Sequence, residues 1–294
     1  MNTAVRPGNK ILDNILSGAP KPKALLYHYT TQRGLLGIIE NREIWATHHQ
    51  CLNDTQEFFH AKELFRQEIA ERADTDPLLA EMQRTLDGER GFEDVNLYVA
   101  SLSEDEDSLA QWRAYGGPAS GFSLGFDTEG IILPSEFRLV PCIYEETKQS
   151  EILRSLVVGL LEKLHEIPKD ITIRPYVETL CRTELHSLAL LLKHPKFAEE
   201  REWRIISVGP MMEDPPDEGE APLDFREGRS TLIPYRRVPL RSNKSRLPFP
   251  LAEVVVGPNP NPEQSIRSVR SLLASHGLSN YCSCRRSDVP YRNW

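Results

Sequence analysis

The chain has 294 residues, of which 39% are hydrophobic and 27% are charged, and its formal net charge is −8. This composition is typical of a globular protein with a sizeable core, and the negative charge argues against a general nucleic-acid coat. The longest apolar runs, LVVGLL and LALLL, are too short to span a bilayer, and the N-terminal segment lacks the apolar core of a signal peptide. We therefore expect a cytoplasmic protein without a membrane partner.

The predicted elements begin after a flexible lead-in over residues 1–23, which ends in SGAPKPK. Apolar residues recur at every second position in some segments and every third or fourth in others, which indicates strands and helices respectively. Strands are expected over 24–30, 43–47, 96–103, 121–127, 137–144, 201–208, 230–240, 251–258 and 280–285. Helices are expected over 31–41, 52–73, 106–116, 149–167, 175–194 and 262–277, with Asn53 or Asp54 capping the second of them.

Strands and helices follow one another without regular alternation, so the predicted fold class is α+β with a mixed, mainly antiparallel sheet. Residues 24–294 are expected to form a single domain in which 146–195 is a helical insertion. The stretch 211–224 is acidic and rich in proline, which predicts a mobile loop.

Cysteine and histidine spacing gives no metal signal. The odd number and scattered positions of the five cysteines favour reduced thiols over a disulfide framework. His48 and His49 are adjacent and would point apart on a strand, so no metal is expected there. The chain also lacks a phosphate-binding glycine loop, a dinucleotide fingerprint and a nucleophile elbow.

The run LLYHYT places His28 and Thr30 on one face of the first predicted strand and Tyr29 on the other. A lone strand histidine is more often a packed core residue than a catalyst. On another predicted strand, Ser101 and Ser103 share a face. Their hydroxyls could brace a carboxylate or a ribose, although such serines are more often structural.

Tyr115 ends a short predicted helix and precedes two glycines, which leave one face of its ring uncovered. Its ring, or that of Trp112, could stack on a flat heterocycle. Further along, FAEEREWRII predicts a strand with Glu200, Glu202 and Arg204 on one face. Neighbouring carboxylates repel, which raises the pKa of at least one of them, whereas the alternative interpretation is a surface salt bridge.

A basic stripe follows the acidic loop, with Arg236 and Arg237 near its middle. It could meet a phosphate-bearing ligand, or it could be a solvated strand pair whose charges face the acidic loop. Its seven basic residues are Arg226, Arg229, Arg236, Arg237, Arg241, Lys244 and Arg246.

Four blocks of the sequence resemble a bacterial family catalogued as a domain of unknown function, DUF2971. The blocks are LYHYTTQRGLLGIIENREIWATHHQCLNDTQE, SLSEDEDSLAQWRAYG with GFSLGF, KFAEEREWRII, and VVVGPNPNPEQ with DVPYR. Together they span about residues 25–292. The family label names no activity.

A second resemblance carries the functional expectations. A strand ending in His-x-Thr, followed by a helix of the GLLGIIENREI kind, is similar to the opening of NAD-using ADP-ribosyltransferases whose sites contain histidine, tyrosine and glutamate. The resemblance implies a split sheet of ADP-ribosyltransferase type. It also implies that His28 holds a ribose hydroxyl, Thr30 helps to bind the dinucleotide, Tyr115 or Trp112 stacks on nicotinamide, and Glu202 acts at the nicotinamide ribose. Tyr29 stands where polymerases of that group usually have glycine.

The implied function is transfer of ADP-ribose from NAD to a protein or nucleic-acid acceptor, as in toxins or phage-defence effectors, with Glu202 or Glu200 catalytic. One alternative is a sensor module that binds NAD or a nucleotide without turning it over. Another is a nucleic-acid-processing phosphotransferase or nuclease that uses Arg236 and Arg237. His28 and Glu202 could also be only a buried pair that fixes the sheet. The enzymatic hypothesis requires the histidine, the ring and the carboxylate to meet in one cleft.

Overall fold

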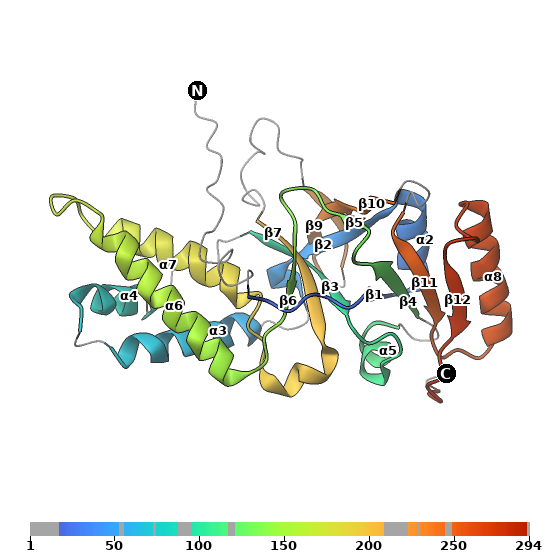
Figure 1. Cartoon of the computed structure of the whole chain (residues 1–294), viewed down its shortest axis with the longest axis horizontal. Helices are drawn as coiled ribbons and strands as arrows, with labels where there is room; N and C mark the ends of the chain where they lie inside the picture. Colours follow the sequence, from blue (N-terminus) through green and yellow to red (C-terminus); the bar gives the residue numbers. More distant parts are fainter. Residues whose placement is uncertain are drawn as a thin grey trace, which may run out of the picture.

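Ten strands of the described chain form one mixed, mostly antiparallel sheet, with helices along it and beyond one end (Figure 1). The computed structural model describes residues 18–52, 56–72, 75–87, 96–116, 121–208, 223–228, 230–244 and 249–292. The predicted α+β class with a mainly antiparallel sheet is confirmed.

In chain order the strands are β1 (Leu25–Thr30), β2 (Glu43–His48), β3 (Leu97–Ser103), β4 (Phe122–Asp127), β5 (Ile131–Ile132), β6 (Arg138–Pro141), β7 (Glu202–Val208), β8 (Asp224–Glu227), β9 (Leu232–Pro239), β10 (Arg241–Ser242), β11 (Leu251–Val256) and β12 (Ser283–Arg286). All nine predicted strands are found, whereas the short strands β5, β8 and β10 were not predicted. The short β5 and β10 pair with each other outside the main sheet.

The sheet is forked at β3. On one edge, β3 pairs with β7 along its whole length. The other edge is shared, because Ser103 pairs with Tyr27 of β1 whereas Tyr98 and Val99 pair with β2. β1 and β2 therefore diverge near Ser101. The arm of β1 continues through β4, β11 and β12, the arm of β2 continues through β9 and β8, and β6 pairs with β7.

The helices are α2 (Gln32–Asn41), α3 (Gln56–Ala70), α4 (Pro77–Asp87), α5 (Leu109–Tyr115), α6 (Glu146–His165), α7 (Arg174–Ala189) and α8 (Pro262–Ser275), with 3₁₀ turns η1 (His49–Cys51) and η2 (Pro195–Glu200). α3, α4, α6 and α7 pack into a helical cluster at one end of the sheet (Figure 1). Its apolar core, which includes Phe65, Leu156 and Leu185, continues onto Val99 and Ile206 of the sheet.

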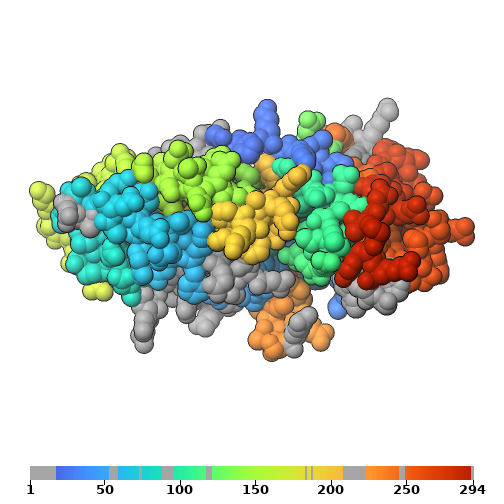
Figure 2. Space-filling model, turned by 90° about the horizontal axis from the view of Figure 1, so that it is seen from below, coloured from blue at the N-terminus to red at the C-terminus, as the bar shows by residue number. Residues whose placement is uncertain are grey.

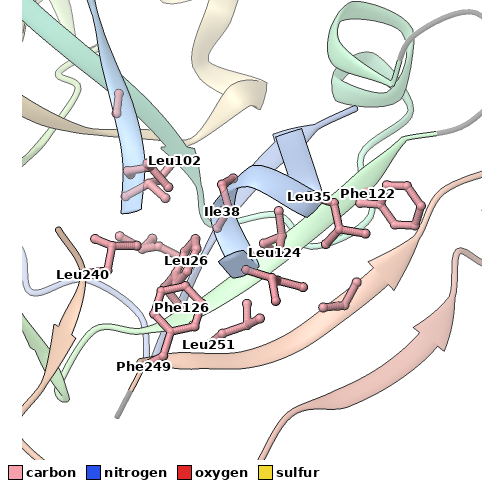
Figure 3. Packing of buried hydrophobic residues seen from close by; sticks show 14 of the residues in the cluster. Leu26, Leu35, Ile38, Leu102, Phe122, Leu124, Phe126, Leu240, Phe249 and Leu251 are labelled. Atoms are coloured by element: carbon pink, nitrogen blue, oxygen red, sulfur yellow. The ribbon is translucent and has the colours of Figure 1, made fainter. Parts of the chain in front are cut away.

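The two faces of the sheet carry different helices. On the first face, which we call the α2 face, Leu26, Leu102 and Trp203 belong to a core to which α2 and α8 contribute. Figure 3 shows Leu26 and Leu102 with Leu35 and Ile38 of α2. On the opposite face, which we call the α5 face, Tyr29 packs against Trp112 of α5. Val99 and Ile206, which belong to the core of the helical cluster, alternate along β3 and β7 with residues of the α2 face. They therefore leave the α5 face, and the helical cluster covers that part of it.

The start of α2 depends on a local cap. The Thr31 hydroxyl accepts a hydrogen bond from the Gly34 amide at 3.3 Å, which satisfies one of the unpaired donors of the first turn. Arg42, with φ of 55°, ends the helix in the left-handed region and turns the chain into β2. Leu35, Ile38 and Ile39 then face the core at helical spacing.

Two glycines of α2 should respond oppositely to alanine. A Cβ at Gly34 would lie 1.9 Å from Thr30 Oγ1, whereas a Cβ at Gly37 meets nothing within 4 Å. Gly37→Ala should stabilise the protein by about 0.5–1 kcal/mol through helix propensity. Gly34→Ala should instead destabilise it by about 1–3 kcal/mol through overpacking. Urea unfolding of both variants tests this prediction. Equal free energies of unfolding for the two variants would show that the Thr30 side chain can move aside without loss of stability.

Several predicted features lie partly outside the described residues. These are residues 1–17 of the lead-in, the cap candidates Asn53 and Asp54, and residues 211–222 of the acidic loop, whose last residue, Asp224, begins β8. Within the described ranges, no helix has the length and apolarity needed to cross a membrane.

Candidate functional site

Glu202, the first residue of β7, lies at the centre of a buried group of charges. Its side chain is only 7% exposed. Its carboxylate accepts hydrogen bonds from Arg204, with Nε and one terminal nitrogen each at 2.9 Å, and from Lys193 Nζ at 2.5 Å. Lys193 Nζ also donates to Glu200 Oε2 at 2.5 Å. We call Lys193, Glu200, Glu202 and Arg204 the Glu202 cluster.

Glu200 and Glu202 reach the cluster from different elements. The expected strand face holds for Glu202 and Arg204 but is wrong for Glu200, which ends η2. Arg201 takes a left-handed conformation, with φ of 44°, and turns the chain between the two glutamates. Lys193 is therefore able to lie between their carboxylates.

The charges of the cluster keep Glu202 ionised. Burial alone would raise the pKa of Glu202, but the charges and hydrogen bonds of Arg204 and Lys193 outweigh burial and lower this pKa to about 2. The expectation that carboxylate repulsion raises a pKa therefore fails at Glu202, because two cations lie among the acids. The result is a buried carboxylate that is ionised near neutral pH.

Tyr115 borders this cluster and Trp112 does not. The Tyr115 side chain is 40% exposed at the end of α5, and burial, followed by the charges of Glu202 and Glu200, raises its pKa. Trp112 is 2% exposed, packs edge-on against Tyr29 at 4.7 Å and donates its indole N–H to Asp107 at 2.7 Å. Of the two candidate stacking rings, Tyr115 is therefore the accessible one.

Ser103 and Tyr29, two of the residues predicted to bind the cofactor, have hydroxyl groups that form hydrogen bonds with the backbone. Ser103 Oγ donates to the Glu200 carbonyl at 2.7 Å and accepts from the Asp105 amide at 3.0 Å. Tyr29 donates to the Asp105 carbonyl at 2.7 Å and accepts from the Ser108 amide at 2.9 Å. These bonds fix the loop that follows β3 and carries the chain to α5.

His28 does not share a face with Glu202. Tyr27 pairs with Ser103 and Ser103 pairs with Glu202, so these three residues leave the α5 face. His28 alternates with Tyr27 and therefore leaves the α2 face. The expected convergence of His28 and Glu202 in one cleft is thus not found.

At the fork, His28 has a structural partner. Its Nδ1 lies 2.9 Å from the carbonyl oxygen of Ser101, and since a carbonyl only accepts, Nδ1 carries the hydrogen. Burial lowers the pKa of His28. Thr30, on the same face, lies beneath α2 against Gly34. Both side chains serve the packing between β1, β3 and α2.

The basic stripe does not form a continuous surface. Arg236 and Arg237 are adjacent on β9 and point to opposite faces. Arg236 is buried, donates to Ser207 Oγ at 2.5 Å and lies over the Phe137 ring. Arg237 is exposed and forms a two-point ion pair with Asp224, which raises its pKa. Arg229 and Arg246 lie outside the described residues.

The sequence patterns missed three residues around Glu202. Lys193 directly follows the apolar run LALLL. A charged residue at the end of such a run was the one sequence signal that could have indicated a buried cation. Tyr144 accepts a hydrogen bond from the Glu202 amide at 2.9 Å. The Cys142 thiol lies 3.7 Å from Glu202 Oε2.

A small cavity of about 10 Å³ lies away from the Glu202 cluster. Its lining is apolar, with Leu26, Ile44, Leu102 and Ile205 among the side chains on the α2 face. A space of this size and polarity is a packing defect and does not hold an ordered ligand. Among the described residues, no group of three or more His, Cys, Asp or Glu side chains could hold a metal ion.

The class of protein defined by these observations is an α+β protein with a forked sheet and a buried, ionised glutamate cluster beside an exposed tyrosine. The family model described as Protein of unknown function (DUF2971) matches residues 111–205, which supports the resemblance drawn from the sequence. All four residues of the Glu202 cluster, and Tyr115, fall within that range. No curated protein and no solved structure matches the chain.

Proposed function

We propose that the protein is an NAD-dependent ADP-ribosyltransferase and that the Glu202 cluster, with Tyr115, is its active site. The observation that carries the proposal is the buried, ionised carboxylate of Glu202 beside the half-exposed ring of Tyr115. His28, which the resemblance placed in the same cleft, lies on the other face of the sheet, so the proposal rests on Glu202 and Tyr115 and not on the His-x-Thr segment.

The proposed reaction breaks the bond between C1′ of the ribose and the nicotinamide nitrogen. Nicotinamide leaves with the electron pair, and positive charge develops on the sugar, as in glycoside hydrolysis. A carboxylate stabilises this charge more strongly in the transition state than in the ground state. Lys193 and Arg204 hold Glu202 in the ionised form that this role requires. The acceptor then forms the new bond to C1′ and loses its proton.

This proposal assigns roles that differ from the sequence-based expectation. Tyr115 is the stacking ring, Glu202 the charge-stabilising carboxylate and Glu200 a second carboxylate nearer to solvent. His28 and Thr30 lie on the α2 face and contribute to the sheet instead of contacting NAD.

The decisive experiment is to incubate the protein with NAD and measure released nicotinamide and labelled acceptor. We expect nicotinamide release by the wild-type protein together with label on a macromolecular fraction of cell extract. Absence of nicotinamide release at saturating NAD would overturn the transferase proposal.

Tyr115 offers a matched pair of variants. Removing a stacking ring costs about 0.5–1.5 kcal/mol, so Tyr115→Ala should raise the Kd for NAD by about 2- to 12-fold. Tyr115→Phe keeps the ring and should bind as the wild type does. Isothermal titration measures both constants, and equal weakening by the two variants would assign the effect to the hydroxyl.

One observation favours a second candidate, a sensor that binds NAD without turning it over. Both oxygens of Glu202 already accept charge-assisted hydrogen bonds, so the carboxylate is engaged within the protein and Tyr115 alone would contact NAD. NAD binding by isothermal titration without nicotinamide release would select this candidate.

A further inference from the structure

Phe197 presents an aromatic ring beside the Glu202 cluster. It belongs to η2, and in a 3₁₀ turn side chains three residues apart lie on the same side. Phe197 therefore shares a side of η2 with Glu200, which accepts a hydrogen bond from Lys193. The Lys193 ammonium lies 5.3 Å from the centre of the Phe197 ring, a cation–π contact, and 2.5 Å from Glu202 Oε2. The ring is thus held against the cluster by the same cation that pairs with both glutamates.

Phe197 resembles Tyr115 in its exposure and in its place at the cluster. Each side chain is 40% exposed. Burial, followed by the charges of Glu202 and Glu200, raises the pKa of Tyr115, so this ring also lies close to the cluster. Figure 2 shows η2 and α5, which carry the two rings, side by side at the surface. Two accessible aromatic rings from neighbouring elements therefore border one group of charges.

This pair of rings matches a ligand with two flat groups. A single exposed aromatic side chain is ordinary on a protein surface, whereas two rings at one charged group indicate a common ligand. NAD carries nicotinamide at one end and adenine at the other, joined through two riboses and a pyrophosphate. Tyr115 is the proposed partner of nicotinamide, and Phe197 is then available for the second heterocycle. Nucleobases stack favourably on aromatic side chains because both have flat π systems.

We propose that Phe197 stacks on the adenine ring of NAD and makes the site selective for the dinucleotide over nicotinamide mononucleotide. This inference rests on the proposed function, in which Tyr115 stacks on nicotinamide. The Lys193 ammonium contacts both the Phe197 ring and Glu202, so the adenine site is held in place relative to the carboxylate. No bond forms or breaks at Phe197, and its contribution is to the affinity for NAD.

The test measures the affinity of the full chain for NAD and for two of its fragments by isothermal titration. ADP-ribose contains adenine but lacks nicotinamide, whereas nicotinamide mononucleotide contains nicotinamide but lacks adenine. Phe197→Ala should raise the Kd for NAD and for ADP-ribose about 2- to 12-fold and leave the Kd for nicotinamide mononucleotide unchanged. Tyr115→Ala should weaken nicotinamide mononucleotide and leave ADP-ribose unchanged.

Two variants control for effects other than stacking. Phe197→Tyr keeps the ring and should bind all three ligands as the wild type does. Tyr176→Ala removes a ring that is 45% exposed at the start of α7, and it should also bind them as the wild type does. Urea unfolding of Phe197→Ala establishes that this variant is folded. A displacement of Lys193 on loss of the ring would disturb Glu202 and so weaken nicotinamide mononucleotide as well.

The outcomes separate this inference from the proposed function. Unchanged affinity of Phe197→Ala for ADP-ribose, or an equal loss of affinity for nicotinamide mononucleotide, overturns the adenine site and leaves the transferase proposal standing. A wild-type protein that binds neither NAD nor ADP-ribose overturns both. A loss confined to the two ligands that contain adenine, with wild-type binding by Phe197→Tyr, supports the adenine site.

Discussion

Replacing Glu202 by glutamine is expected to abolish NAD turnover and to lower the free energy of unfolding by about 3–5 kcal/mol. The amide removes the negative charge that stabilises the developing oxocarbenium ion, and it leaves Arg204 and Lys193 buried without their shared anion. Stability falls because both cations are buried and lose the anion that they share, so that Lys193 keeps only its ion pair with Glu200 and Arg204 loses its bonds to the carboxylate.

The control for this prediction is a second buried glutamate in the helical cluster. Glu184 is also 7% exposed at its side chain and pairs with Lys163 at 2.7 Å. Glu184→Gln should likewise destabilise the protein but keep NAD turnover at temperatures where it is folded. Urea unfolding and nicotinamide release measured on both variants separate stability from chemistry. Wild-type turnover in folded Glu202→Gln would show that Glu202 is not the catalytic carboxylate.

Lowering the pH from about 6.5 to 4 is expected to destabilise the protein by about 3 kcal/mol through His48. His48 is 1% exposed, and burial, followed by the neighbouring His49, lowers its pKa from 6.5 to about 4. Between these two values the unfolded chain binds more protons than the folded protein. Stability therefore falls as the pH falls through this window.

His48→Gln tests this assignment. Nε2 of His48 lies 3.1 Å from Asn96 Oδ1, and a glutamine amide can retain that bond without titrating. Urea unfolding between pH 7 and 4 should show a smaller loss of stability in the variant than in the wild type. Identical pH profiles would assign the acid sensitivity to other groups, such as His28. Glu202 contributes below this window, because its stabilisation is lost only as the pH falls from about 4.5 towards 2.

The faces of single strands could be predicted from the sequence, but their relation across the sheet could not. Alternation correctly separated His28 from Tyr29. Whether His28 shares a face with Glu202 depends on the pairs Tyr27–Ser103 and Ser103–Glu202, which join segments far apart in the chain. A shift of one residue in either pair would reverse the answer, and local patterns do not encode that register.

The remaining differences have local physical causes. The left-handed residue that separates Glu200 from the strand is an arginine, and only glycine or asparagine would have signalled such a turn. α4 was not predicted, although Leu79, Met82 and Leu86 have helical spacing and the Asp76 carboxylate accepts from the Leu78 amide. Lys193 bonds the cluster from a chain segment outside the sheet, so no strand pattern pointed to it.

At the fork of β3, the His28 side chain forms a hydrogen bond with the β3 backbone that a neighbouring strand would form in an unbroken sheet. Ser101 directs its carbonyl towards the edge where β1 and β2 part, and the His28 imidazole takes the position that a neighbouring backbone amide would occupy in an unbroken ladder. A side chain thus adds a link between β1 and β3 beyond the backbone pair Tyr27–Ser103. Substitution of His28 removes this link without removing any backbone pair of the sheet.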